Sequence, residues 1–145
     1  MIRPAVTQDY AVLAELWEAS VRATHDFLAE EDLAFYRERL VAEYFPQVRL
    51  WVCEECGGIC GFIGISDMVE MLFVHPSRFG RGVGTALLSF AVDKCGMRRV
   101  DVNEQNHAAL AFYLARGFKA VGRSATDGEG RPYPLLHLEI AARRT

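Results

Sequence analysis

The residues with the most evident chemistry lie in one glycine-rich segment, residues 75–88. Three of its glycines alternate with larger residues: Gly80, Gly82 and Gly84. Because glycine has no side chain, the N–H groups of such a loop can turn toward a ligand, and a helix beginning near Gly84 would add its positive end. Arg78 and Arg81 bring positive charge to the rim. The segment therefore predicts a cradle for a phosphate or pyrophosphate group.

Two common phosphate-binding motifs do not fit this loop. The nucleotidase motif G-x-x-x-x-G-K-[ST] needs a lysine directly before Thr85, where Gly84 stands, so ATP hydrolysis is disfavoured. The dinucleotide motif G-x-G-x-x-G would need a third glycine at Thr85 or Leu87, depending on which glycine begins it. The motif that remains is the Q/R-x-x-G-x-G/A loop, which binds the pyrophosphate of coenzyme A. A glycine-rich turn without a ligand is the alternative, but it would cost backbone entropy without a packing return.

The hydrophobic pattern around this loop predicts alternating helices and strands. Apolar residues at steps of three and four predict helices at about 7–21, 31–44, 85–94 and 108–115. Short apolar runs predict strands at 50–54, 59–66, 69–75, 100–102, 118–122 and 135–140, after an extended start at 2–5. Gly57-Gly58 would join the first two strands in a hairpin, and Thr7 or Asp9 would cap the first helix. This order favours an α/β (α+β) fold, a mixed sheet with helices on both faces, whose ligand binds where strands end.

Length and composition narrow the class of protein. The 145 residues, 51% hydrophobic and 24% charged, are expected to form one domain, 1–145, with a sizeable core. The net charge of −3 argues against a nucleic-acid partner. No apolar run reaches the roughly 20 residues of a membrane helix, and the first residues lack a signal-peptide pattern. We therefore expect no membrane partner and a cytoplasmic location.

The cysteines do not form a recognisable metal or redox motif. Cys53 and Cys56 have C-x-x-C spacing, but no second pair or histidine follows at ligand spacing to complete a zinc site. A redox pair would normally begin a helix, whereas Cys53 ends an apolar run and Cys56 precedes Gly57. We expect reduced, structural thiols and no bound metal.

Three segments together resemble the GNAT superfamily of N-acetyltransferases. Residues 72–76 look like the family's central strand, and residues 80–88 look like its pyrophosphate loop and following helix. Residues 106–118 look like its N-x-x-A-x-x-F-Y-x-x-x-G-F signature. The resemblance implies the GNAT acyl-CoA N-acyltransferase fold, with a central, mostly antiparallel sheet, and acetyl-CoA as the cosubstrate.

By this resemblance, the cofactor is held along the central strand, the loop and the helix after it. The residues implied are Leu72, Phe73, Val74, Arg78, Phe79, Gly80, Arg81, Gly82, Val83, Gly84, Thr85, Asn106 and Tyr113. One departure concerns Phe79, which occupies the Q/R position of the loop motif, with Arg78 beside it. The departure bears on affinity for the cofactor rather than on its identity.

Two groups are implied to act on the thioester. The backbone N–H of Leu72 would polarise its carbonyl. Tyr113 aligns with the tyrosine that many members use as a general acid toward the coenzyme A sulfur, and with an ordinary pKa of about 10 it is protonated at neutral pH. The alternative for Tyr113 is a packing role, which its spacing with Leu110 and Leu114 would suit. Asn106 would hydrogen-bond the cofactor arm, cap its helix, or do both.

The group that takes the proton from the amine is left open among three candidates. Glu70 lies on the central strand and Asp101 on the next, and alternation allows either side chain to point into or away from a cleft. His25, with an ordinary pKa near 6.5, is chemically the readiest base. Each has a structural alternative: a solvated charge for Glu70, a strand-edge charge for Asp101 and a capping role for His25. A water relay is a further alternative. Similarity to a small bacterial subgroup of the family implies that Tyr133 lines the acceptor pocket.

Two functions fit these observations. One is an acetyl-CoA-dependent N-acetyltransferase that transfers the acetyl group directly, in a ternary complex, to a primary amine. Residues 23–28, 102–106 and 132–136 are similar to a small bacterial subgroup assigned protein lysines as substrates, so the expected partner is a protein lysine or a small amine. The other function is a non-catalytic acyl-CoA-binding sensor of the same fold, favoured by Phe79 and the unassigned base. Either would be a monomer or a homodimer.

Overall fold

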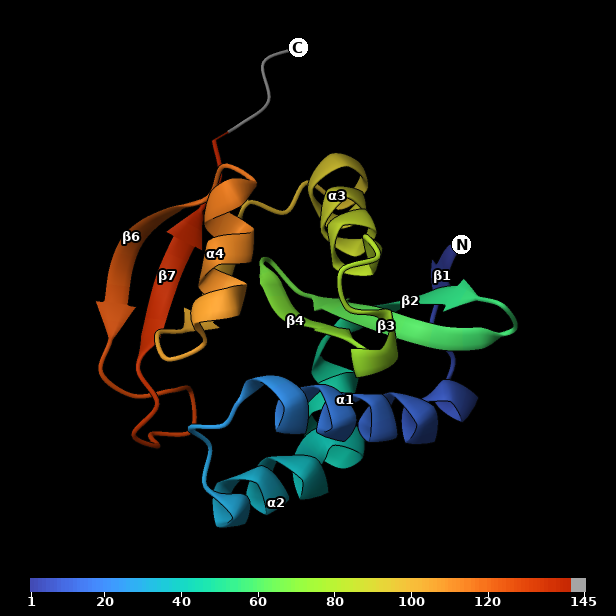
Figure 1. Ribbon diagram of the computed structural model, residues 1–145, viewed down its shortest axis with the longest axis horizontal. Coiled ribbons are helices and arrows are strands. Elements are labelled where there is room, and N and C mark those ends of the chain that lie inside the picture. Colours follow the sequence, from blue (N-terminus) through green and yellow to red (C-terminus); the bar gives the residue numbers. More distant parts are fainter. Residues whose placement is uncertain (142–145) are drawn as a thin grey trace. The chain divides into compact units, whose positions relative to one another are not determined.

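The structure is a computed structural model that describes residues 1–141 and divides into two compact units. The first unit is Met1–Met97, and the second begins at Arg98. Figure 1 shows their helices and strands along the chain. Within the described residues, no helix combines the length and the apolar character needed to cross a membrane.

The first unit is built on four strands with helices on both faces. The strands are β1 (Ile2–Pro4), β2 (Arg49–Glu55), β3 (Gly58–Ile65) and β4 (Val69–Val74), paired in that order and antiparallel. Figure 1 shows α1 (Tyr10–Thr24) and α3 (Val83–Cys95) on opposite sides of β3 and β4. Successive side chains of β3 alternate between them, because Phe62 is buried in the core beneath α1 and the Cβ position of Gly61 lies against α3. The predicted arrangement of helices is confirmed in this unit.

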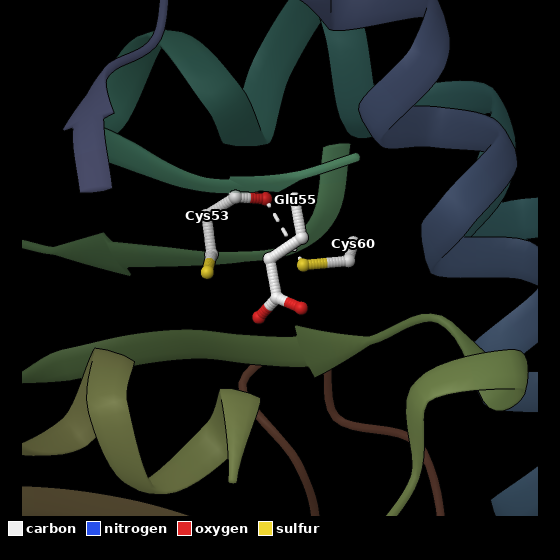
Figure 2. Close-up of side chains that lie close together, drawn as sticks. All are labelled: Cys53, Glu55 and Cys60. Atoms are coloured by element: carbon white, nitrogen blue, oxygen red, sulfur yellow. Dashed lines mark hydrogen bonds between the residues drawn. The ribbon is translucent and has the colours of Figure 1, made fainter. Parts of the chain in front are cut away.

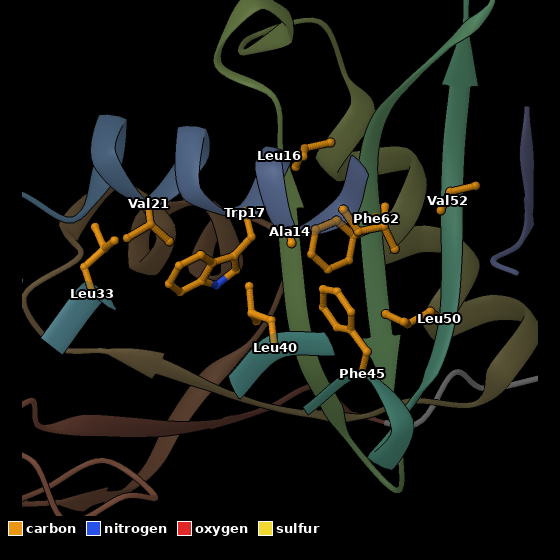
Figure 3. Close-up of a cluster of buried hydrophobic side chains, with 11 residues drawn as sticks. Ala14, Leu16, Trp17, Val21, Leu33, Leu40, Phe45, Leu50, Val52 and Phe62 are labelled. Carbon is orange, nitrogen blue, oxygen red and sulfur yellow. The ribbon is translucent and has the colours of Figure 1, made fainter. Parts of the chain in front are cut away.

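The core beneath α1 follows from the predicted apolar face of that helix. Figure 3 shows its side chains packed against those of β2, β3 and the segment after α1. The buried members are Leu13, Ala14, Leu16, Trp17, Val21, Leu33, Leu40, Phe45, Leu50, Val52 and Phe62. A short 3-10 turn, η1 (Thr7–Asp9), precedes α1, and the Asp9 carboxylate accepts the Val6 N–H at 2.9 Å and pairs with Arg3 at 2.8 Å. Of the two predicted capping residues, Asp9 acts, but on this preceding turn.

The second predicted helix is interrupted, which corrects the expected single helix at 31–44. An α-helix, α2 (Glu30–Arg39), continues as a π-type turn, η2 (Leu40–Tyr44), and a 3-10 turn, η3 (Phe45–Gln47). The Phe45 N–H donates to the Leu40 carbonyl, five residues back. Pro46 cannot continue a helix ladder, and the wider turn directs Phe45 into the core, where its ring lies 5.9 Å from that of Phe62. Burial of this aromatic ring outweighs the local preference for a continuous helix.

The hairpin between β2 and β3 turns one residue earlier than predicted. Its central residues are Cys56 and Gly57, at φ +52° and +79°, and Gly58 already belongs to β3. Positive φ at both central residues matches the twist of paired strands in a two-residue hairpin. The register also shifts between Cys53 and Glu54, so Cys53 pairs with Gly61 while Glu54 pairs with Ile59. Cys60 is the extra residue of this β-bulge, because it lies between Ile59 and Gly61, which pair with the adjacent residues Glu54 and Cys53.

The described part of the second unit, residues 98–141, holds three paired strands and one helix. Its elements are β5 (Arg99–Asn103), α4 (His107–Ala115), β6 (Lys119–Ser124) and β7 (Leu135–Glu139), and β7 pairs antiparallel with both other strands. Val100, Val102 and Leu138 are buried, whereas Asp101 and its partner His137 lie on the opposite face. The strand predicted to begin at Phe118 begins one residue later, because Phe118 is itself buried at the end of the connection from α4.

Candidate functional site

The glycine-rich loop leads directly into α3, which begins two residues earlier than predicted. Gly80 and Gly82 have φ of +74° and +83°, and no atom lies within 4 Å of a Cβ position on either. Ala86 donates the first hydrogen bond of the helix, to the Gly82 carbonyl, so the N–H groups of Val83 and Gly84 have no acceptor within the helix ladder. An open backbone surface at the positive end of a 13-residue helix fits a pyrophosphate. The chain can therefore hold this part of coenzyme A.

The side chains around the loop differ in what they can offer. Arg81 is exposed and forms no ion pair within residues 1–141. Arg78, in the 3-10 turn η4 (Pro76–Arg78), lies 4.0 Å from the Glu55 carboxylate. Phe79 is 43% exposed, so the side chain at the Q/R position offers an apolar surface and no charge. The His75 ring nitrogen Nδ1 accepts the Ser77 N–H at 3.1 Å and holds η4 in place.

Packing beneath the loop fixes the start of α3 against the sheet. Val83 is 2% exposed, and its Cγ1 lies 2.8 Å from the Cβ position of Gly61 on β3. A side chain at Gly61 would therefore displace the first turn of α3. The Val83 side chain packs in the core, so only the backbone of this residue is available to a ligand. Thr85, two residues further along α3, is half-buried.

The strand β4 presents alternate N–H groups to its two edges. The His75 N–H donates to the Cys60 carbonyl of β3 at 2.8 Å. Because these groups alternate along a strand, the N–H of Phe73 also faces β3, and those of Leu72 and Val74 face the other edge. The Phe73 ring packs against Trp17 and Phe62 at 6.3 and 5.7 Å between centroids, so it belongs to the core.

In the second unit, Tyr113 and Asn106 occupy the two ends of α4. The Tyr113 side chain is 6% exposed, with its ring 5.1 Å from Phe112 and 5.5 Å from Phe118. Burial raises the pKa of Tyr113 above its ordinary value of 10, so the hydroxyl stays protonated. The Asn106 carboxamide oxygen accepts the Ala109 N–H at 3.2 Å, which is the predicted cap.

His25 is held at the end of α1 in a form that makes it a weak base. The backbone N–H of His25 donates to the Val21 carbonyl at 2.7 Å, and the ring nitrogen Nδ1 lies 2.7 Å from Thr24 Oγ1. The Thr24 hydroxyl donates to the Ser20 carbonyl at 2.8 Å, so Nδ1 carries the ring proton and Nε2 the lone pair. Burial lowers the pKa of His25 to about 4, although the Asp26 charge acts in the opposite direction.

The two carboxylate candidates have different partners. Glu70, on β4, is exposed and accepts the Ser66 hydroxyl at 2.9 Å. Asp101, on β5, lies 2.6 Å from His137 Nδ1, and His137 Nε2 lies 2.7 Å from Ser124 Oγ. The carboxylate can only accept, so Nδ1–H donates to Asp101 and Nε2 accepts the Ser124 hydroxyl.

The relay Ser124–His137–Asp101, a chain of two hydrogen bonds, is a candidate site that the sequence analysis did not find. Its three residues come from β6, β7 and β5, and the register Asp101↔His137 brings the ring to the carboxylate. A prediction of strand register at His137 would have found the pair. The geometry is the one by which a histidine, oriented by a carboxylate, takes a proton from a hydroxyl.

Two observations bear on the expected acceptor side. Tyr133 is 7% exposed, so burial leaves little of its surface to line a pocket. A surface groove of about 480 Å³ lies between α1 and α2, lined by residues that include Glu18, Arg22 and Glu30. These charges pair among themselves, at 3.0 Å for Arg22 with Glu18 and 2.6 Å for Arg22 with Glu30, and none of the predicted site residues lines the groove.

Comparison with known proteins assigns the family. Residues 46–120 match the acetyltransferase (GNAT) domain family. Peptidyl-lysine N-acetyltransferase YjaB from Escherichia coli K12 is 40% identical over 142 residues, 94% of each chain. The solution structure of apo-form YjaB from Escherichia coli matches with a TM-score of 0.88 at 37% identity, covering 99% of this chain and 98% of that one. PaiA N-acetyltransferase from Thermoplasma acidophilum in complex with coenzyme A shares the fold, with a TM-score of 0.76 at 21% identity over 97% and 98%.

These findings confirm the predicted fold, the resemblance to the YjaB subgroup and the enzyme class. Acetyl-CoA, the predicted cosubstrate, is the cosubstrate of this family. The chain belongs to the GNAT family of N-acetyltransferases.

Proposed function

We propose that this chain acetylates the ε-amino group of protein lysines, as one catalytic domain of residues 1–145 in the cytoplasm. The observation that carries the proposal is the 40% identity to a peptidyl-lysine N-acetyltransferase over 94% of both chains. That similarity extends over both units, as does the family match at 46–120. The alternative, an acyl-CoA-binding sensor, would bind the cofactor without turnover.

The loop and the start of α3 bind the pyrophosphate of the donor. When bound, acetyl-CoA supplies an activated thioester. The N–H groups of Val83 and Gly84 meet the phosphate oxygens, and Gly80 and Gly82 let the backbone approach them closely. Arg81 adds a charge-assisted contact, since Arg78 already lies near Glu55. Phe79, at the position of the family's polar side chain, would offer the cofactor an exposed apolar surface and no charge.

Two hydrogen-bond donors act on the reacting thioester. The Leu72 N–H, on the edge of β4 that faces away from β3, polarises the carbonyl. The Tyr113 hydroxyl donates to the sulfur as negative charge develops on it. Because burial raises the pKa of Tyr113 while a thiol has a pKa near 8.5, a hydrogen bond to the thiolate is favoured over complete proton transfer.

The relay Ser124–His137–Asp101 takes the proton from the attacking amine. A lysine ammonium has an ordinary pKa of about 10.4 and must lose a proton before it can attack. His25 is too weak a base for this step, because burial lowers its pKa to about 4. His137 has its Nε2 lone pair available through Ser124, while Asp101 fixes the ring and balances the imidazolium charge. The amine proton passes to Ser124 Oγ as the Ser124 proton passes to His137.

Release of coenzyme A, measured with a panel of acceptors, tests the proposed function. We expect turnover with lysine-containing peptides whose N-terminus is blocked, and mass spectrometry should place the acetyl group on the lysine side chain. The matched control is the same peptide with arginine in place of lysine. Binding of acetyl-CoA without turnover on any acceptor would support the sensor. Turnover confined to polyamines or free amino acids would show that the acceptor is a small amine and not a protein lysine.

The proposed base is tested separately with His137→Gln, using His107→Gln on the exposed start of α4 as the control. We expect His137→Gln to lower kcat/KM about 10²-fold at neutral pH, with partial recovery at high pH, where more of the amine is already neutral. His107→Gln should leave the profile unchanged. A pH–rate profile of His137→Gln that overlays the wild type would assign the proton transfer to water or another group.

A further inference from the structure

The hairpin between β2 and β3 gathers two thiols and a carboxylate at one point. The donor atoms of Cys53, Glu55 and Cys60 all lie within 4.8 Å of one another. Figure 2 shows the Glu55 carboxylate reaching toward the two sulfur atoms. Both cysteines are 4% exposed, whereas the Glu55 side chain is 41% exposed. The cluster is therefore built into the sheet on its sulfur side and reachable from solvent on its oxygen side.

The β-bulge explains why the two thiols meet. Alternation along a regular strand would place Cys60 on the face opposite Gly61, the residue that pairs with Cys53. The register shift removes this alternation at Cys60, so its sulfur lies near that of Cys53 and its thiol donates to the Cys53 carbonyl at 3.2 Å. The two cysteines that meet are thus Cys53 and Cys60, across the hairpin, and not the C-x-x-C residues Cys53 and Cys56, which the sequence analysis set aside as a motif.

We propose that Cys53, Cys60 and Glu55 bind a thiophilic divalent cation of the zinc class. Two thiolates and one carboxylate are ligands that Zn²⁺ prefers, and three protein ligands leave a fourth tetrahedral position for water. Binding releases the protons of the two thiols to solvent and leaves one excess negative charge on the site. The Arg78 guanidinium, 4.0 Å from the Glu55 carboxylate, neutralises this excess.

Packing of the Cys53 and Cys60 thiols does not by itself explain why the Glu55 carboxylate lies beside them. The Cys60 thiol already has a hydrogen-bond acceptor in the Cys53 carbonyl, at 3.2 Å, so it needs no carboxylate nearby. A carboxylate oxygen within 4.8 Å of both sulfur atoms instead completes the donor set of a zinc site. The arrangement is that of a coordination site more than that of a core contact.

Cobalt titration of the reduced chain, residues 1–145, tests the proposal. Co²⁺ adopts zinc sites, and thiolate ligands give it a charge-transfer band in the near ultraviolet together with visible bands that report tetrahedral geometry. We expect a stoichiometric charge-transfer band that Zn²⁺ abolishes. Cys53→Ser, Cys60→Ser and Glu55→Gln should each weaken cobalt binding at least about ten-fold. The matched controls are Cys56→Ser and Cys95→Ser, which should titrate like the wild type.

Three outcomes would overturn the proposal. One is a wild-type chain without the charge-transfer band, and another is a band that survives unchanged in Cys53→Ser or Cys60→Ser. The third is a band lost in Cys56→Ser or Cys95→Ser, which would place the metal on other thiols. If a cysteine variant fails to fold in a far-ultraviolet circular dichroism control, Glu55→Gln decides the matter, because its exposed side chain can be replaced without disturbing the core. Unweakened cobalt binding by Glu55→Gln would then count against the site.

Discussion

Replacing Gly61 with alanine should couple a packing defect in β3 to weaker cofactor binding. The new Cβ would lie 2.8 Å from Val83 Cγ1, 3.1 Å from Leu87 Cδ1 and 3.1 Å from the Phe73 carbonyl oxygen. The carbonyl belongs to the paired strand β4 and cannot move cheaply, so the strain falls on Val83 and the start of α3. Overpacking of this kind costs about 1–3 kcal/mol. For a chain of this size that corresponds to a Tm lower by roughly 2–12 °C.

The same strain sets the size of the binding effect. If the start of α3 moves to relieve the contact, acetyl-CoA must restore its position on binding, and the affinity falls by at most the strain energy. One to three kcal/mol is a factor of about 5 to 150 in Kd. Isothermal titration calorimetry with acetyl-CoA would measure Kd, and a thermal melt without ligand would measure the loss of stability.

Two glycines on the same strand provide matched controls. Gly58→Ala places its Cβ where no atom lies within 4 Å, so both Tm and Kd should stay close to wild type. Gly64→Ala brings its Cβ 2.9 Å from Val48 Cγ2 and 3.3 Å from Leu50 Cδ2, so it should lower Tm without affecting α3. If Gly61→Ala lost no more acetyl-CoA affinity than Gly64→Ala, the position of the loop would not depend on this contact and the reasoning would be refuted.

Three further predictions concern single groups. Gly82→Ala and Gly96→Ala each place an alanine in a left-handed conformation, at φ +83° and +71°, at one end of α3. Both should lower the free energy of unfolding in urea by about 1–2 kcal/mol, but only Gly82→Ala should weaken acetyl-CoA binding. Equal Kd values for the two variants would place the phosphates elsewhere. Tyr113→Phe should keep Tm within a few degrees and lower kcat about 10²-fold, with Tyr10→Phe as the control, and unchanged turnover would leave Tyr113 a packing residue. Burial lowers the pKa of His25 from 6.5 to about 4, so the unfolded chain takes up this proton first as the pH falls. The neutral His25 ring therefore makes its full contribution to the free energy of unfolding above about pH 6.5. This contribution decreases as the pH falls toward 4, by up to about 3 kcal/mol. His25→Gln should flatten urea-derived stability over pH 4.5–7, and an unchanged slope would contradict the burial of the ring.

Local patterns were enough to predict most helices and strands and the glycine-rich loop before α3. The periodic face of α1, the glycine that ends α3 and the cap at Asn106 each depend on residues within one or two turns of each other. The interrupted second helix was not predictable in this way. Its form depends on Phe45 reaching Tyr10 and Phe62, which are distant in the sequence.

The candidate site shows the same limit more sharply. Asp101 was a candidate by its residue type, but its partner His137 is 36 positions away and joins it through strand register, so the pair could not be read from local spacing. His25 was the readiest base by its ordinary pKa, and burial reversed that ranking. The Cys53–Cys60 proximity depends on a bulge, which shifts a side chain from one face of a strand to the other and leaves no mark in residue spacing.

The placement of the two tryptophans makes the first unit separately observable during unfolding. Trp17 packs against Phe73 of β4, and Trp51 lies 4.7 Å from Phe90 of α3, so both indoles report on the first unit. No tryptophan lies beyond residue 97, whereas α4 and three strands of the second unit contribute to the far-ultraviolet circular dichroism. Coincident fluorescence and dichroism transitions would mean that the units unfold as one cooperative system. A fluorescence transition separated from the dichroic one would instead resolve the chain into two folding units with distinct stabilities.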